Sequence, residues 1–153
     1  MSAANFKIDQ LHCREYLVDG ELKRWDGDTS EVFSTIDSNP DTPYSPTLLG
    51  SIPDMDSESA IEALESARKA FNRGQGIWPT MKVRDRLKAM KRFADKMNEH
   101  RDQIVNLLMW EIGKNQSDSE KEFDRTVQYM YDTIGALKDI DRTSSTFLIE
   151  EGI

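Results

Sequence analysis

The chain has a single cysteine, Cys13, among its 153 residues. One cysteine excludes an internal disulfide framework and a metal site built from cysteines alone. The first ten residues, MSAANFKIDQ, contain no positively charged segment followed by an apolar run, so we expect no signal peptide. No apolar run approaches the ~20 residues that a helix needs to cross a bilayer. We therefore predict a cytoplasmic protein that does not use a membrane as a partner.

Basic residues are in the minority, with 20 lysines and arginines against 28 aspartates and glutamates. Binding to the phosphates of nucleic acid requires a basic surface, so we expect no nucleic-acid partner. The local basic run at residues 82–92 is interpreted as the outer face of a helix. Hydrophobic residues make up only 37% of the chain, which is low for a domain of this length. Either the chain exposes much helix surface, or part of its core lies in sequence not present here.

Residues 1–55 are predicted to be β-rich, with short hairpin strands between residues 15 and 53. Asp19-Gly20 lies at the centre of residues 16–25 and is the strongest short hairpin signal. Residues 31–36 and 47–53 have the β-branched and apolar composition of strands. Between them, residues 38–46 are rich in proline, asparagine, aspartate and serine, which is typical of a loop.

Residues 56–142 are predicted to be mainly helical. Asp56 or Ser57 is a candidate N-cap of an alanine-rich helix that Gly74 and Gly76 would end. The apolar positions of this helix form one stripe: Ala60, Ile61, Ala63, Leu64, Ala67, Ala70 and Phe71. Further periodic segments run from 83 to 97 and from 104 to 112, with a break at 98–100 and a stop at Gly113.

A last helix is predicted to begin with a capping box formed by Ser117 and Glu120. Its apolar stripe lies within an arc of roughly 120° and comprises Phe123, Val127, Met130, Tyr131, Ile134 and Leu137. Residues 143–153 are interpreted as the start of a further strand, at 145–153.

The positions of the two histidines favour neither a catalytic nucleophile nor a metal site. His12 precedes Cys13, but adjacent residues in a strand point to opposite faces, so the two would not share a hydrogen bond. We interpret Cys13 as a small structural or exposed thiol. His100 lies between charged residues at a predicted helix end and is interpreted as solvated.

Two other segments resemble ligand sites only in part. Residues 26–31 match the first half of a calcium loop, but the sixth position is not glycine, and Asp37 stands where the closing glutamate belongs. We interpret this segment as an acidic turn. The glycines at 74 and 76 are too few for a phosphate loop. The residues themselves therefore contain no catalytic constellation, and no metal is expected.

Arg125 lies in EFDRTVQYM, residues 122–130, within the last predicted helix. About 200° separates it from Phe123 around the helix axis, which places it opposite the apolar stripe. Glu122, three residues earlier, is within reach for an ion pair. The pattern alone favours a solvated arginine over one that holds an anionic ligand.

The linear order of these motifs resembles the N-terminal portion of an aldehyde dehydrogenase. A DG hairpin and a strand ending in LGSIP precede an alanine-rich helix, a tryptophan, R-x-R-L and WEIGK at 110–114. LLMWEIGK followed by EKEFDRT most resembles the non-phosphorylating, NADP-dependent glyceraldehyde-3-phosphate dehydrogenases.

The resemblance implies an α/β fold in which residues 1–153 form an incomplete N-terminal part of the cofactor-binding domain, without the catalytic domain. It implies that Arg125 contributes to binding the substrate phosphate. It also implies that the full-length enzyme uses NADP, oxidises glyceraldehyde 3-phosphate to 3-phosphoglycerate and forms a homo-oligomer. The catalytic cysteine, the glutamate base and the cofactor-binding glycine segment have no counterpart here, so Cys13 is not the nucleophile.

Two alternatives stay open. The full-length enzyme could oxidise another aldehyde, such as a semialdehyde or betaine aldehyde, with Arg125 merely exposed. The chain could also be a non-enzymatic helical interaction module. For the 153 residues alone we expect no dehydrogenase activity and no bound cofactor. We also expect them to self-associate or to be only partly ordered, because they would expose surface meant for a missing sheet.

Overall fold

The computed structural model describes residues 8–37 and 46–144. In these two ranges the strands come first: β1 (Leu11–His12), β2 (Glu15–Val18), β3 (Glu21–Arg24), β4 (Thr29–Asp37) and β5 (Pro46–Pro53). The helices follow: α1 (Ser57–Phe71), the 3₁₀ turn η2 (Asn72–Gly74), α2 (Ile77–Thr80), α3 (Val83–Glu99), α4 (Arg101–Ile112) and α5 (Gln116–Ser144). This order confirms the predicted α/β class, with small strands before helices. The strand expected at 145–153 and most of the loop expected at 38–46 lie outside the described residues.

The hairpin predicted at Asp19-Gly20 is confirmed. β2 and β3 pair antiparallel, with Leu17 opposite Leu22. Asp19 and Gly20 have φ values of 53° and 82°, so both occupy the left-handed region that a two-residue hairpin turn of type I′ requires. The amide of Asp19 also donates to the hydroxyl of Ser66 at 2.8 Å, which ties the turn to α1.

A second sheet has the strand order β1–β5–β4, in which β1 is parallel and β4 antiparallel to β5. Gly50 on β5 lets β1 approach. A Cβ atom at this position would lie 1.8 Å from the carbonyl oxygen of Leu11, and the φ of Gly50 is 155°. On the other side of the sheet, the buried Ser34 of β4 donates its hydroxyl to the carbonyl of Trp110 at 2.5 Å. This bond fastens the sheet to α4.

Helix α1 begins where the sequence predicts and ends earlier. The carboxylate of Asp56 accepts a hydrogen bond from the amide of Ser59 at 2.8 Å, which confirms the N-cap. The predicted stop at Gly74 or Gly76 is wrong, because Asn72 takes the left-handed conformation (φ 44°) one residue after Phe71. Asparagine tolerates this conformation better than other residues with a Cβ atom, and it can therefore end a helix as glycine does.

The break between α3 and α4 falls at His100, and Gly113 ends α4 with a φ of 68°, both as predicted. The predicted capping box at Ser117 and Glu120 is wrong. The cap of α5 is Asn115, whose side-chain oxygen accepts from the amide of Asp118 at 2.9 Å. Ser117 therefore lies inside the first turn of the helix, where it cannot act as the N-cap.

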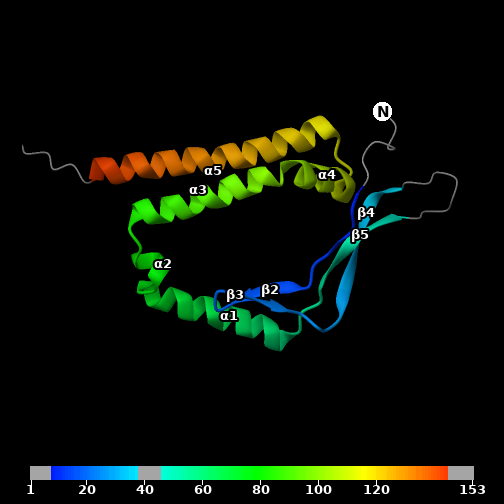
Figure 1. Cartoon of the computed structure of the whole chain (residues 1–153), viewed down its shortest axis with the longest axis horizontal. Helices are drawn as coiled ribbons and strands as arrows, with labels where there is room; N and C mark the ends of the chain where they lie inside the picture. Colours follow the sequence, from blue (N-terminus) through cyan, green and yellow to red (C-terminus); the bar gives the residue numbers. More distant parts are fainter. Residues whose placement is uncertain (1–7, 38–45, 145–153) are drawn as a thin grey trace, which may run out of the picture.

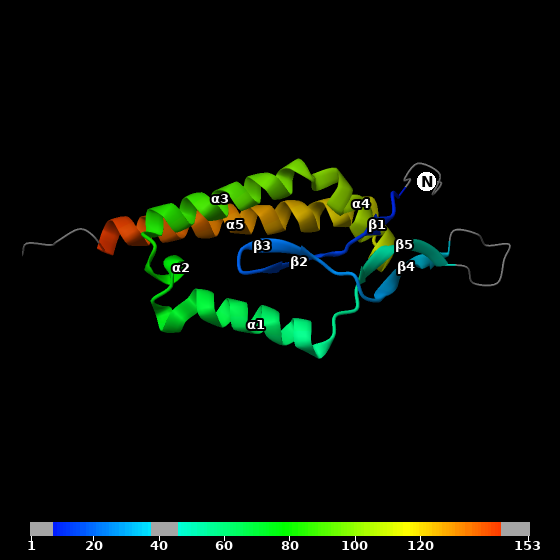
Figure 2. The same ribbon diagram turned by 60° about the horizontal axis from the view of Figure 1, so that its bottom comes forward.

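The buried cluster lies among α3, α4 and α5. Val105, Phe123 and Val127 form its centre, and the half-buried hydrophobic residues around it are Met97, Ile104, Met109 and Tyr131. Figures 1 and 2 show α3 and α5 side by side and antiparallel, with α4 next to the β4–β5 end. The predicted stripe of α5 is thus confirmed at its first two positions by the burial of Phe123 and Val127.

Helix α1 lies apart from this cluster, on the other side of the β2–β3 hairpin (Figure 2). None of its residues is buried. Ile61, Leu64 and Phe71 of the predicted stripe are 59%, 64% and 57% exposed. The apolar stripe of α1 therefore exists but has no buried contact within the described residues.

Candidate functional site

Arg125 lies on α5 between two buried residues of the cluster, Phe123 and Val127. Its own side chain is exposed. The helix is held by the face that carries Phe123 and Val127, so Arg125 must project from the other side. The outward direction predicted for Arg125 is confirmed.

Arg125 borders a shallow groove of about 360 Å³ near the start of α5. The lining residues come from the first four turns of α5 and from the residue after Gly113: Lys114, Asp118, Lys121, Glu122, Arg125, Thr126 and Tyr129. Three of these side chains are cationic and two are anionic. The groove is therefore polar, with an excess of one positive charge among the residues that line it.

The two carboxylates of the groove pair with its lysines. The carboxylate of Glu122 accepts a hydrogen bond from Lys114, and that of Asp118 lies 3.7 Å from the amine of Lys121. The ion pair considered between Glu122 and Arg125 does not form, and Glu122 pairs with Lys114 instead.

Asp124, the residue before Arg125, is also engaged elsewhere. Its two carboxylate oxygens accept from Nε and Nη2 of Arg101 at 2.8 and 2.9 Å. This bidentate pair lowers the pKa of Asp124 below its ordinary value, mainly through the hydrogen bonds from Arg101. Among the described residues the side chain of Arg125 has no hydrogen-bond or ion-pair partner. The excess charge of the groove therefore resides on Arg125.

Hydroxyl groups stand near this charge on the same side of α5. Thr126 and Tyr129 line the groove, and Tyr129 is 63% exposed. The hydroxyl of Thr126 donates to the carbonyl of Glu122 at 2.8 Å. The sequence patterns alone predict no role for Tyr129. The signal that could have found it is its spacing of four residues from Arg125, which places both on one helix face.

The other residues considered as sites do not come together. The ring nitrogens of His12 face the Ser51 hydroxyl at 2.9 Å and the Gln10 side chain at 3.4 Å, so His12 does not pair with Cys13, as predicted. Cys13 is an exposed free thiol. His100 is exposed between α3 and α4.

The acidic turn at residues 26–31 is organised by its neighbours. The indole N–H of Trp25 donates to the carbonyl of Asp28 at 2.7 Å, and Arg14 donates to the carbonyl of Gly27 at 3.2 Å. In the part of the chain that the structure describes, no cluster of three or more histidine, cysteine, aspartate or glutamate side chains could hold a metal ion. Nor is any helix within residues 8–37 and 46–144 both long and apolar enough to cross a membrane.

The mixed fold, with two small sheets followed by an α-helical layer, is that of an α/β protein. Residues 32–151 match the model of the aldehyde dehydrogenase family. The chain belongs to the aldehyde dehydrogenase family.

Two curated relatives support this assignment. The mitochondrial benzaldehyde dehydrogenase of Antirrhinum majus is 34% identical over 98 residues, which cover 64% of this chain and 17% of the relative. The mitochondrial aldehyde dehydrogenase family 2 member B4 of Arabidopsis thaliana is 28% identical over 105 residues, or 69% of this chain and 18% of the relative. The chain thus spans less than a fifth of the length of these relatives. No solved structure matches it.

Proposed function

We propose that this chain is the N-terminal part of an NADP-dependent aldehyde dehydrogenase that oxidises glyceraldehyde 3-phosphate, and that Arg125 binds the substrate phosphate. One observation carries the proposal. Arg125 is an exposed arginine whose acidic neighbours, Glu122 and Asp124, are engaged by Lys114 and Arg101. Its charge is therefore available to an anion, and guanidinium groups match phosphate oxygens in geometry.

We propose no cofactor-binding role for the described residues. The pyrophosphate of a dinucleotide is ordinarily held where a glycine-rich turn leads from a strand into a helix. Gly74 and Gly76 instead follow helix α1, and a Cβ atom at Gly76 would lie 1.8 Å from the carbonyl oxygen of Ala70. Close packing against the end of α1 explains why position 76 is a glycine. We therefore assign Gly74 and Gly76 no role in binding the cofactor.

The role of the chain in the proposed enzyme is to position one cation beside the substrate. The cluster around Phe123 fixes the orientation of α5, and this helix holds the Cα atom of Arg125 in place. A charge-assisted hydrogen bond to phosphate contributes about 1.5–3 kcal/mol where water is excluded, which corresponds to about a 10- to 150-fold effect on binding. The 153 residues alone are expected to have no dehydrogenase activity.

The experiment compares two substrates in the polypeptide that carries this chain together with the catalytic part of the enzyme. Arg125→Ala should raise the Michaelis constant for glyceraldehyde 3-phosphate about 10- to 150-fold and change that for unphosphorylated glyceraldehyde little. Lys121→Ala is the matched control, because Lys121 lines the same groove but lies beside Asp118. Equal effects of Arg125→Ala on both substrates would refute the phosphate role.

A second candidate substrate is an aldehyde without a phosphate group. The observation in its favour is that one relative, at 34% identity, is named as a benzaldehyde dehydrogenase. The semialdehydes and betaine aldehyde belong to the same unphosphorylated group. In this case Arg125→Ala would leave both Michaelis constants unchanged, and the preferred substrate would be found among unphosphorylated aldehydes.

We also propose that the enzyme is a cytoplasmic homo-oligomer that acts on a small molecule. The two relatives are both named as mitochondrial proteins. Imaging of a fluorescent fusion against a mitochondrial stain would therefore distinguish the two locations.

A further inference from the structure

Tyr129 is an exposed aromatic residue one helical turn after Arg125, and both side chains line the same polar groove. Residues four apart on a helix are neighbours, with Cβ atoms roughly 5–6 Å apart. A helical side chain also leans toward the N-terminus of its helix and covers the turn before its own Cα atom. This geometry directs Tyr129 over the turn that carries Arg125.

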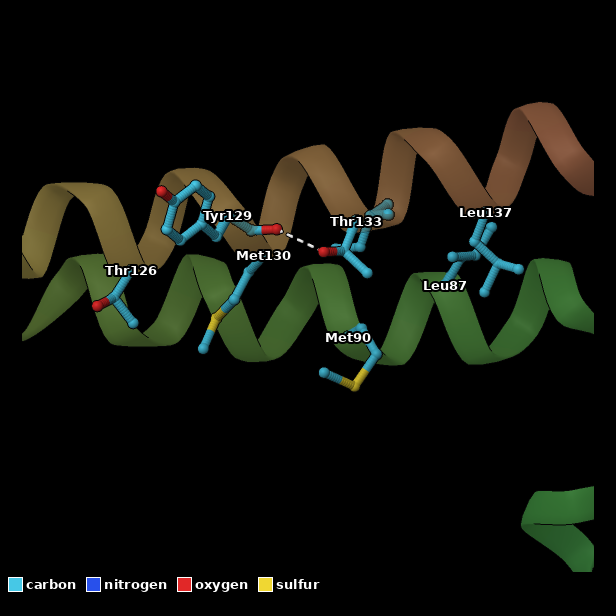
Figure 3. Close-up of a pocket in the computed structure, with 8 residues that line it drawn as sticks. Leu87, Met90, Thr126, Tyr129, Met130, Thr133 and Leu137 are labelled. Atoms are coloured by element: carbon cyan, nitrogen blue, oxygen red, sulfur yellow. Dashed lines mark hydrogen bonds between the residues drawn. The ribbon is translucent and has the colours of Figure 1, made fainter.

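The orientation of Tyr129 in the structure agrees with this geometry. Tyr129 stands at the border between the polar groove and the apolar hollow that Met90 and Met130 line. Figure 3 shows its ring directed away from these two methionines, with the hydroxyl end on the Thr126 side of α5. Among the described residues the phenolic hydroxyl has no hydrogen-bond partner. The groove therefore contains two unengaged donors on adjacent turns, the guanidinium of Arg125 and the hydroxyl of Tyr129.

The other polar groups of the groove are engaged. Its two acidic residues, Asp118 and Glu122, both precede Arg125 along α5, and each lies beside a lysine. The hydroxyl of Thr126 donates to a backbone carbonyl. An anion held between Arg125 and Tyr129 therefore meets two available donors at the end of the groove away from the acidic residues.

The number of acceptor oxygens distinguishes two classes of anion at such a pair of donors. A guanidinium group binds a carboxylate through two parallel hydrogen bonds, which engage both of its oxygens. A phosphate group has three terminal oxygens, so one of them is left after the same bidentate contact. The hydroxyl of Tyr129, one turn from Arg125, is placed to donate to this third oxygen.

We propose that Tyr129 donates a hydrogen bond to the phosphate that Arg125 binds, and that the two residues together select phosphorylated aldehydes over aldehydes that end in a carboxylate. This inference rests on the proposed phosphate role of Arg125. Tyr129 determines specificity and takes no part in the chemistry at the aldehyde.

Steady-state kinetics of the polypeptide that carries this chain together with the catalytic part of the enzyme tests the role of Tyr129. The substrates are glyceraldehyde 3-phosphate and unphosphorylated glyceraldehyde. The carboxylate probe is 5-oxopentanoate, whose carboxyl carbon lies as many bonds from the aldehyde as the phosphorus does in glyceraldehyde 3-phosphate. Its affinity is measured as an inhibition constant against glyceraldehyde oxidation.

Tyr129→Phe keeps the ring and removes only the hydroxyl. It should raise the Michaelis constant for glyceraldehyde 3-phosphate about 3- to 10-fold, and should change kcat, the Michaelis constant for glyceraldehyde and the inhibition constant of 5-oxopentanoate less than about twofold. Thr126→Val is the matched control, because it removes from the same groove a hydroxyl that is already donated to the carbonyl of Glu122. It should leave all of these constants within about twofold of the wild type.

Arg125→Ala, measured in parallel, separates this proposal from the one on which it rests. If Arg125→Ala raises the Michaelis constant for glyceraldehyde 3-phosphate and Tyr129→Phe does not, the role of Tyr129 is overturned and that of Arg125 stands. If Arg125→Ala leaves this constant unchanged, the phosphate site itself is refuted and the role of Tyr129 with it. Equal effects of Tyr129→Phe on the phosphorylated substrate and on 5-oxopentanoate, or equal effects of Tyr129→Phe and Thr126→Val, would overturn the proposed selectivity.

Discussion

Replacement of Phe123 by alanine tests the role of the buried cluster that orients α5. Phe123 is 3% exposed and packs with Val105 and Val127. Its ring is therefore almost completely removed from water, and its truncation removes that burial and leaves a cavity. Substitutions of this kind in protein cores lower the free energy of unfolding by about 3–5 kcal/mol.

The surroundings of Phe123 place the expected cost at the lower end of this range. Met97 and Met109 are half-buried at the edge of the cluster, and methionine side chains adapt to fill part of a cavity. A substitution destabilises a core less when its neighbours can move into the cavity. We therefore expect Phe123→Ala to lower the free energy of unfolding by about 3 kcal/mol. For a chain of this size, that loss corresponds to a fall in Tm of roughly 6–12 °C.

The assay is urea unfolding of the wild type and of two variants, followed by far-ultraviolet circular dichroism. Phe123→Ala should shift the midpoint strongly. Ile140→Ala, on the same helix at a position 63% exposed, should change stability by less than about 0.5 kcal/mol. A cost below about 1 kcal/mol for Phe123→Ala, or equal costs for the two variants, would show that this cluster does not hold α5 in place.

Two further substitutions test local features. Asn115→Ala should destabilise the chain by about 1 kcal/mol, while Ser117→Ala should have little effect; the reverse order in thermal unfolding would reinstate the capping box. Asp95 accepts hydrogen bonds from Lys91 at 2.8 Å and from the Tyr131 hydroxyl at 2.7 Å, which lower its pKa below the ordinary value. Because the pKa of Asp95 is lower in the folded than in the unfolded state, its ionised carboxylate stabilises the fold at pH values above the unfolded-state pKa of about 4. This stabilisation is lost as the pH falls through the folded-state pKa. The wild type should therefore be more stable than Asp95→Asn near neutral pH, and the difference should disappear in acid; a difference independent of pH in urea unfolding would contradict this.

The candidate site was predictable only in part. The outward direction of Arg125 follows from its spacing relative to Phe123, because helix geometry alone relates the two positions. Its lack of a partner does not follow, since Glu122 is close enough in sequence to pair with it. The structure engages Glu122 with Lys114 across the connection between α4 and α5. That contact depends on how the two helices meet, which no local pattern encodes.

Features that depend on a few adjacent residues were determined by the sequence itself. The turn at Asp19-Gly20, the cap at Asp56 and the stop at Gly113 each depend on backbone conformations that these residues adopt readily. The apolar stripe of α5 is likewise contained in its 3.6-residue periodicity, which marks the face that is buried. These elements form in the structure as predicted because the tertiary contacts agree with the conformational preferences of the local sequence.

Other features were decided only by the tertiary structure. They are those for which several local conformations are acceptable, and those whose partners come from distant segments of the chain. Asn115, not Ser117, caps α5, and Asn72 ends α1 before the glycines that follow. The parallel pairing of β1 with β5 joins segments about 40 residues apart, and it needs the space that Gly50 leaves beside Leu11. The stripe of α1 has the same periodicity as that of α5, yet α1 has no buried residue. Periodicity defines which face of a helix can be buried, whereas the arrangement of the other elements determines whether anything covers it.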